Sequence, residues 1–406
     1  MAERIDVVVV GGGQAGLATS HELTELGVEH VVLEREKVAS SWRRRWESFC
    51  LVTPNWSVNL PGGAYDGDDP DGYLPRDEIV TFFERYARSF DAPVREGVDV
   101  TALQPRGAGF LLRTPDGEIA SHSVVVATGA YQRPFRPAAA ATMPSGILQL
   151  DADDYRDPAS LPDGRVLVVG SGQTGCQIAE ELHETGRDVV LSCGRAPWAP
   201  RRLGDRDIVW WAVETGFFDQ PVSALPAPSA RLAANIQNTG HGGGHTLNYR
   251  TLRAAGVTLV GHLVGVDDHR ATFAPDLAES VSWGDDRYRE LMASCHRCAL
   301  ERGLPMPEMP EPEPFDATAP EELDLRDVGA VVFAGGFRSE YGSWIPVPEA
   351  FDDLGFPLHH EGTSSIVPGL FFVGVHFLRT RKSSLLWGVG EDAAIVARHV
   401  SDRGTA

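Results

Sequence analysis

The chain contains one glycine-centred unit twice, and this repeat restricts its fold more than any other feature. Residues 7–33 and residues 166–192 align at a constant offset of 159 positions, the separation of Gly11 and Gly170. Each unit runs from an apolar stretch through a G-x-G-x-x-G turn to a helix-like stretch and a second apolar stretch. The identical pairs include Gly11/Gly170, Gly13/Gly172, Gln14/Gln173, Gly16/Gly175, Glu22/Glu181, Leu23/Leu182 and Gly27/Gly186.

Each glycine of this motif has a physical task. The first allows a tight turn, the second lets the backbone approach a pyrophosphate, and the third lets helix and strand pack closely. The helix that follows presents free N–H groups and the positive end of its dipole to the phosphates. Two such units in one chain imply two dinucleotides, or one dinucleotide and a unit that has lost its ligand.

The repeat also predicts how the chain is divided. We expect an α/β fold with two Rossmann-like dinucleotide-binding domains, each a three-layer sheet. Residues 304–325 are rich in proline and acid, as in an extended connector, and apolar strand-like sequence resumes after them. The expected first domain contains residues 1–145 and 326–406. The second domain, residues 146–325 with helical and loop insertions, is inserted into it.

The two units differ where a dinucleotide ribose would be read. Glu34 ends the first unit, and its carboxylate can accept hydrogen bonds from ribose hydroxyls. At the same offset the second unit has Cys193, and Arg195 lies two residues further on. Losing a carboxylate and gaining a guanidinium favours a 2′-phosphate. The residues therefore predict FAD or NAD at the first site and NADPH at the second. The alternative for Arg195, Arg201 and Arg202 is that they are surface charges after a strand.

Composition excludes several classes of partner. The formal net charge of −21 argues against nucleic acid and against an anionic membrane surface. No apolar run approaches the roughly 18 residues of a membrane helix, and the strand-like start leaves no room for a signal peptide. Five scattered cysteines do not form a disulfide framework, so a reducing cytoplasm is the expected location.

Two stretches between the units carry further candidate ligand contacts. Residues 42–46 read WRRRW, and arginine and tryptophan near a dinucleotide site can pair with phosphate or stack on a planar ring. A surface loop anchored by tryptophan is the alternative. Thr128 and Gly129 follow a buried strand, and we expect the backbone to approach a ligand there. Near the end, residues 388–392 begin a helix whose N-terminus can face an electron-rich ring.

Two pairs of metal-ligand residue types have other interpretations. His241 and His245 are four apart, but three intervening glycines argue against a helix, so we expect a mobile loop near a substrate and no metal, with plain disorder as the alternative. Cys295 and Cys298 form a C-x-x-C motif that could be a redox pair. The neighbouring apolar residues have helical spacing, which puts both cysteines on an apolar stripe and favours core packing.

Taken together, these stretches resemble the flavin-containing monooxygenase family, and more narrowly the bacterial class B flavoprotein monooxygenases related to the auxin-forming plant enzymes. The resemblance covers nearly the whole chain. It rests on GGGQAG, SWRRRWESFCLVTPN, VVVATG, GSGQTG and VGVHFLRTRKSSLLWGVGEDAA. It implies an FAD-binding domain into which an NADPH-binding domain is inserted.

The resemblance also implies site residues. For FAD they are Gly11, Gly13, Gln14, Ala15, Gly16, Glu34, Arg35, Trp42, Val100, Thr128 and Gly129. For NADPH they are Gly170, Gly172, Gln173, Thr174, Gly175 and Arg195. Asn55 is the candidate catalytic residue beside the reactive carbon of the flavin. The family fingerprint F-x-G-x-x-x-H is not matched, because Asp151 stands about where its histidine belongs, and this weakens the case for a typical Baeyer–Villiger enzyme.

The implied activity is that of an oxidoreductase, a monooxygenase with a small-molecule substrate and O2. NADPH reduces FAD, O2 forms a C4a-hydroperoxyflavin, and the substrate undergoes N- or S-oxygenation or carbonyl oxidation. Electrophilic and nucleophilic oxygen transfer both remain open, and so does a homodimer. The alternatives are a disulfide reductase-like oxidoreductase that uses Cys295 and Cys298, and a non-catalytic flavoprotein that senses redox state.

Overall fold

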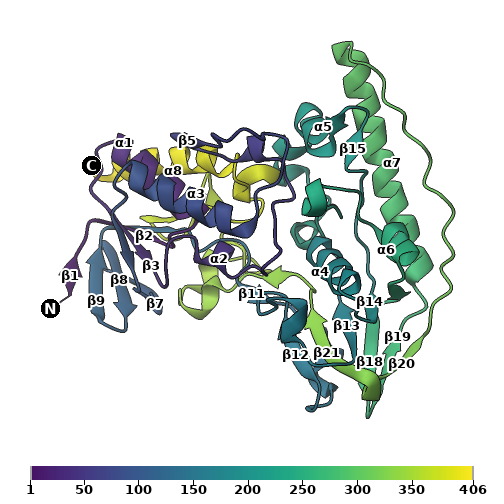
Figure 1. Ribbon diagram of the computed structural model, residues 1–406. Helices are drawn as coiled ribbons and strands as arrows, with labels where there is room; N and C mark the ends of the chain where they lie inside the picture. Colours follow the sequence, from purple (N-terminus) through teal and green to yellow (C-terminus); the bar gives the residue numbers. More distant parts are fainter. Residues whose placement is uncertain (1, 405–406) are drawn as a thin grey trace.

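The computed structural model describes residues 2–404, which form two sheet-based bodies side by side (Figure 1). The first contains a seven-stranded sheet, and the last five strands in its spatial order run parallel to one another. Its strands in spatial order are β23 (His359–His360), β24 (Thr363–Ser364), β25 (Leu370–Phe372), β10 (Ser123–Val126), β2 (Val7–Val10), β3 (Val31–Glu34) and β6 (Val94–Glu96).

Both faces of this sheet are covered, which gives the expected three layers. Helices cover one face: α1 (Gln14–Glu25), α3 (Arg76–Ser89) and α8 (Val389–Gly404). A smaller sheet covers the other face: β1 (Glu3–Arg4), β9 (Gly117–Ser121), β8 (Gly109–Thr114) and β7 (Ala102–Arg106). In β2, Val7 and Val9 pack toward the helices, and Val8 and Val10 pack toward the smaller sheet. A strand buried on both faces reads as an unbroken apolar run, which explains VVVV.

The second body repeats this plan around five parallel strands. In spatial order they are β12 (Leu148–Asp151), β21 (Val328–Phe333), β13 (Arg165–Val169), β14 (Val189–Ser192) and β17 (Thr258–Val260). Helices α4 (Gln173–Glu184) and α6 (Tyr249–Ala255) pack on one face, and a three-stranded sheet packs on the other. That sheet contains β18 (Leu263–Asp267), β19 (Arg270–Phe273) and β20 (Glu322–Asp324).

Shorter elements complete the chain. The first body also contains the short helix α2 (Ser40–Arg43) and a hairpin formed by β4 (Asn59–Leu60) and β5 (Gly63–Ala64). The second body adds β15 (Arg202–Leu203), β16 (Arg206–Asp207), α5 (Ile208–Glu214) and α7 (Leu277–Arg302). Residues 304–320 contain no regular element and run along α7, as expected of a connector (Figure 1). No helix within residues 2–404 is both long enough and apolar enough to cross a lipid bilayer.

The strand pairing corrects one expected boundary. We expected the chain to return to the first domain at residue 326, but β21 pairs with β12 and β13 inside the second sheet. The crossing lies instead at a two-stranded ribbon of β11 (Arg133–Pro134) and β22 (Phe337–Arg338). A buried apolar run looks the same in either sheet, so its sequence does not say which sheet it joins. We propose that the second domain extends from one strand of this ribbon to the other.

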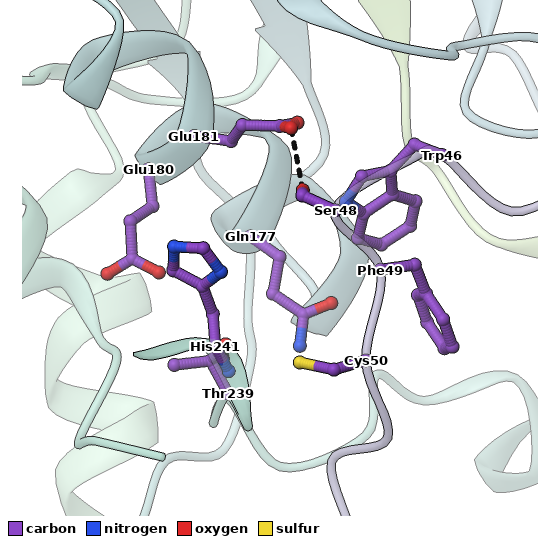
Figure 2. A pocket seen from close by; sticks show the side chains of 9 residues that line it. All are labelled: Trp46, Ser48, Phe49, Cys50, Gln177, Glu180, Glu181, Thr239 and His241. Carbon is purple, nitrogen blue, oxygen red and sulfur yellow. Dashed lines mark hydrogen bonds between the residues drawn. The ribbon is translucent and has the colours of Figure 1, made fainter. Parts of the chain in front are cut away.

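One segment of the first domain holds the second domain in place. Trp46 follows α2 in the chain, yet its side chain is 4% exposed and lies in the core under α4 and β13. Beside it, Arg45 forms an ion pair with Asp153 at 3.7 Å, and Ser48 Oγ donates to Glu181 Oε1 at 2.6 Å (Figure 2). This segment therefore anchors the two domains to each other, which corresponds to the tryptophan-anchor alternative for WRRRW.

We predict that Trp46→Ala destabilises the protein by about 3–5 kcal/mol, because a large side chain is removed from a filled core. Chemical denaturation measures the loss. Leu300→Ala is the matched control, since Leu300 is 64% exposed on α7 and its truncation is expected to change stability by less than about 0.5 kcal/mol. Equal effects of the two substitutions would contradict the anchoring role of Trp46.

Candidate functional site

The first glycine loop joins β2 to α1 at the carboxyl end of the first sheet. Gly11 has a φ of +110°, and a Cβ built on it would lie 2.6 Å from the carbonyl oxygen of Ala127. A Cβ built on Gly16 would lie 1.8 Å from the carbonyl oxygen of Gly11. Neither position accepts a side chain, because a real Cβ does not approach backbone oxygen this closely. The close packing of helix on strand expected from the motif is therefore present.

Gly13 has a different environment, and it tests whether the loop fits a dinucleotide. No heavy atom of the described chain lies within 4 Å of a Cβ built on Gly13. Gly13 is also the N-cap of α1, and within residues 2–404 no side chain caps that helix. An open backbone face at an uncapped helix N-terminus suits a diphosphate, whose oxygens can accept from the free N–H groups. The loop fits the pyrophosphate of FAD.

Glu34 lies directly under this loop. Its Oε2 accepts from the Gly12 amide at 2.7 Å, and its Oε1 accepts from the Glu36 amide and from Ser40 Oγ, both at 3.0 Å. The residue is buried, at 5% exposure. Three donors fix the carboxylate beside the loop, and its remaining lone pairs can accept from a ribose. Ser40 was not predicted. The only signal for it is a hydroxyl a few residues after the acid.

The other residues expected around FAD are placed unevenly. Thr128 and Gly129 follow β10, and the Cα of Thr128 lies 3.4 Å from a Cβ built on Gly11, so both border the loop. Trp42 stacks on Phe83 of α3 with its ring centroid 6.1 Å away, which uses the ring in core packing. Arg35 directly follows Glu34 and is exposed, and Val100 is half-buried against the core under the smaller sheet.

The end of the chain returns to the same loop. A Cβ built on Gly374, just after β25, would lie 2.5 Å from the Cβ of Ala15. Gln14 Nε2 donates to the carbonyl oxygen of Ser384 at 2.5 Å. Helix α8 begins at Val389, within the range expected for that helix start. The N-terminal and C-terminal segments thus build one site together.

Asn55 is buried, at 3% exposure, and its amide is occupied by protein. Its Nδ2 donates to the carbonyl oxygen of Asp69 at 2.9 Å, and its Oδ1 accepts from the Leu74 amide at 2.6 Å. These two bonds hold the loop of residues 69–74 in place. In this arrangement Asn55 positions a loop, and one N–H of the amide is left for another acceptor.

The second glycine loop has the same backbone geometry. Gly170 has a φ of +106°, and a Cβ built on Gly175 would lie 1.9 Å from the carbonyl oxygen of Gly170. The space in front of this loop is less open than that in front of the first loop, because a Cβ built on Gly172 would lie 3.5 Å from the Cβ of Ala234. Gln173, at the start of α4 beside Thr174, donates through Nε2 to the carbonyl oxygen of Ile236 at 3.1 Å. A segment of the second domain therefore lies over this loop.

The residues expected to read a 2′-phosphate separate into two groups. Cys193 is buried, at 1% exposure, and Arg195 after it is exposed and forms no ion pair within the described chain. Arg202 is also exposed, as expected of a surface charge. Arg201 is 3% exposed and pairs with Asp207 at 2.5 Å, while its Nη1 donates to the Val52 carbonyl oxygen at 2.8 Å. Arg201 is thus held internally, and of these only Arg195 and Arg202 are free to meet a phosphate.

The two histidines of the glycine-rich loop point to different partners. His245 Nε2 lies 2.7 Å from Glu180 Oε1, and this hydrogen bond raises the pKa of His245. His241 Nε2 lies 3.3 Å from Glu184, one turn further along α4. Figure 2 shows His241 beside α4, with Gln177 and Glu180 from the same helix. No cluster of three or more metal-ligand residues occurs among residues 2–404.

Cys295 and Cys298 lie on α7, at the outer side of the second domain and away from the first glycine loop (Figure 1). Both are buried and free, and α7 places them on its packed face, which confirms core packing. Burial raises the pKa of Cys295 to about 12, so the thiol stays protonated at neutral pH. A buried neutral thiol is a poor nucleophile. The disulfide reductase alternative therefore lacks a reactive pair here.

We predict that Gly13→Ala weakens FAD binding without unfolding the apoprotein. The Gly13 φ of −89° suits alanine, and space for the Cβ is open until a diphosphate occupies it. Titration of apoprotein with FAD is expected to show a loss of affinity of about tenfold or more, with unchanged thermal unfolding of the apoprotein. Gly16→Ala is the contrasting variant, since it is expected to lower both the affinity for FAD and the thermal stability of the apoprotein. Unchanged FAD affinity in Gly13→Ala would contradict this placement of the diphosphate.

Comparison with known proteins finds relatives along nearly the whole chain. The model of the pyridine nucleotide-disulphide oxidoreductase family matches residues 8–209. An uncharacterized CzcO-like oxidoreductase of Geobacillus kaustophilus is 30% identical over 395 residues, and the match covers 97% of each chain. Indole-3-pyruvate monooxygenase YUCCA1 of Oryza sativa is 29% identical over 184 residues, covering 44% of this chain and 45% of that protein.

A solved structure shows the same fold. The flavin-containing monooxygenase of Stenotrophomonas maltophilia matches with a TM-score of 0.69 at 19% identity, over 98% of this chain and 99% of that one. The two dinucleotide domains expected from the repeat are therefore confirmed, and the comparisons support FAD and NADPH as the cofactors. The chain belongs to the same family as its CzcO-like oxidoreductase relative, and the comparisons support an FAD-dependent oxidoreductase of the flavin-containing monooxygenase type.

Proposed function

We propose that this protein is an NADPH-dependent monooxygenase that oxygenates a small organic substrate. The observation that carries the proposal is that two equivalent glycine loops have different charged residues beside them. The first loop lies over the buried carboxylate of Glu34, and the second is followed by the exposed Arg195. A carboxylate suits the ribose of FAD, and a free guanidinium suits the 2′-phosphate of NADPH.

The chain's own residues would bind and orient the cofactors. The open face at Gly13 would hold the FAD diphosphate, and Glu34 would hold the ribose. Asn55 would fix the loop of residues 69–74 and offer its remaining N–H beside the flavin. Bound FAD supplies hydride acceptance and oxygen activation, and that chemistry belongs to the cofactor.

The substrate class is the less determined part of the proposal. Nitrogen, sulfur and carbonyl compounds all suit flavin-dependent oxygenation. The names of the YUCCA relatives specify indole-3-pyruvate, a carbonyl compound with a carboxylate, and this supports testing 2-oxo acids first. All five cysteines are free, which fits an enzyme of the reducing cytoplasm.

The deciding experiment is anaerobic reduction of the holoenzyme with NADPH, followed by rapid mixing with oxygenated buffer. A monooxygenase is expected to show a transient flavin absorbance that differs from both the oxidised and the reduced spectra and that persists longer when NADP⁺ is bound. Direct return to the oxidised spectrum would argue against the proposal. A flavin that NADPH does not reduce would instead support a redox-sensing flavoprotein.

We predict that Arg195→Ala lowers the efficiency of flavin reduction by NADPH by about tenfold to a hundredfold and leaves that by NADH unchanged. The removed interaction is a charge-assisted contact with the 2′-phosphate, worth about 1.5–3 kcal/mol. Stopped-flow reduction with each nucleotide measures the ratio. Arg113→Ala is the control, because Arg113 is an exposed arginine on β8 of the smaller sheet and is not among the cofactor candidates. Equal losses with NADPH and NADH would show that Arg195 does not read the phosphate.

A further inference from the structure

A short turn near the end of the chain joins the two domains. Residues 381–384 form a 3-10 turn that follows β25 in the first domain. The Val222 amide of the second domain donates to the Arg379 carbonyl oxygen at 2.8 Å, and the Arg381 amide donates to the Gln220 carbonyl oxygen at 3.1 Å. The side chains of this turn therefore lie where the two domains meet.

Three cations stand close together at this junction, and two of them are neutralised. Arg379 contacts Asp392 and lies 3.7 Å from Glu391. Lys382 lies 2.7 Å from Asp219 and 2.6 Å from Glu391. Arg381 lies between them in sequence, and no carboxylate within residues 2–404 pairs with it. The nearby carboxylates thus pair with Arg379 and Lys382, and Arg381 has no counter-ion among the described residues.

The guanidinium of Arg381 lies against neutral groups. Its Cζ lies 4.2 Å from the ring centroid of Phe217 and 4.8 Å from that of Phe377. Its Nη2 donates to Gln220 Oε1 at 2.7 Å, while Nε is buried and has no acceptor in the described chain. Burial lowers the pKa of Arg381 to about 10, so the group remains charged at neutral pH. A partly buried cation that lacks a counter-ion in the described chain is stabilised by a ligand that supplies one.

The surrounding groups add positive charge. Arg231 has a buried Nε that lacks an acceptor in the described chain, and its nearest carboxylate, Asp352, is 3.9 Å away. His376 is influenced by both Arg231 and Arg381, and burial together with these charges lowers its pKa to about 4. The histidine is therefore neutral at neutral pH. At this part of the domain junction, carboxylates pair with Arg231, Arg379 and Lys382, and within residues 2–404 none pairs with Arg381.

The same turn reaches the first dinucleotide loop. Ser384, at the end of the turn, accepts from Gln14 at the start of α1. Aromatic rings continue beside the turn, since Phe218 and Trp387 lie edge to face with centroids 4.9 Å apart. An unpaired guanidinium thus stands three residues from a contact with the FAD loop, next to apolar rings.

We propose that Arg381 binds the carboxylate of an organic acid, the substrate class of this enzyme. A guanidinium presents parallel N–H donors that match the two oxygens of a carboxylate, and the rings beside it suit an apolar or aromatic remainder. This inference rests on the proposed function for its catalytic meaning. The binding itself is testable without any turnover.

The test compares an acid with its neutral analogue on the oxidised holoenzyme. Phenylacetate and phenylacetamide differ mainly in charge, and binding of each is measured by calorimetry and by perturbation of the flavin absorbance. The variants are Arg381→Gln and the charge-matched control Lys382→Gln, whose cation is already paired. The affinity for FAD is measured for every variant, because the FAD diphosphate is the other anion near this turn.

The wild type and Lys382→Gln are expected to bind phenylacetate about tenfold to a hundredfold more tightly than phenylacetamide, as a charge-assisted contact allows. Arg381→Gln is expected to lose that preference with unchanged FAD affinity. Equal binding of the two compounds by wild type, or no binding of phenylacetate, would overturn the inference. Loss of FAD affinity in Arg381→Gln would assign the arginine to the diphosphate instead. Failure of the oxygen-mixing experiment would leave these binding results standing, so the two proposals fail separately.

Discussion

Each dinucleotide loop depends on a close approach between a glycine of its helix and a backbone carbonyl oxygen of the loop. Gly16 lies on the carbonyl of Gly11, and Gly175 lies on that of Gly170, at distances that leave no room for a Cβ. This contact sets the helix directly against the strand end, so that its first N–H groups face the loop. The anionic part of each cofactor can be held there by backbone alone, and side chains are left to choose which dinucleotide binds.

The two loops share this backbone but not their surroundings. In front of Gly13 the structure is open, whereas Ala234 covers Gly172. The covering segment is held by side chains along α4, among them Gln173 and Gln177, which donate to backbone carbonyls of residues 236 and 238. The two loops therefore offer different space to a ligand, although their backbone geometry is the same.

The junction between the domains combines apolar anchoring with one arginine, Arg381, that no carboxylate of residues 2–404 pairs with. Trp46 crosses into the second core, and the β11–β22 ribbon and the turn of residues 381–384 connect the domains elsewhere. These contacts hold the domains in one relative arrangement, which reaction between two cofactors requires. Acids pair with the neighbouring cations Arg379 and Lys382, and within residues 2–404 no carboxylate pairs with Arg381.

The sequence by itself determined the two α/β units and the difference between Glu34 and Arg195, because glycine spacing, apolar runs and strand-end residues are local properties. It also predicted the helical burial of Cys295 and Cys298 from their spacing. Only the tertiary structure decided that β21 joins the second sheet, that Asp207 forms an ion pair with Arg201, and that no carboxylate of residues 2–404 pairs with Arg381. Each of these depends on which residues from distant parts of the chain meet, and no local pattern encodes that.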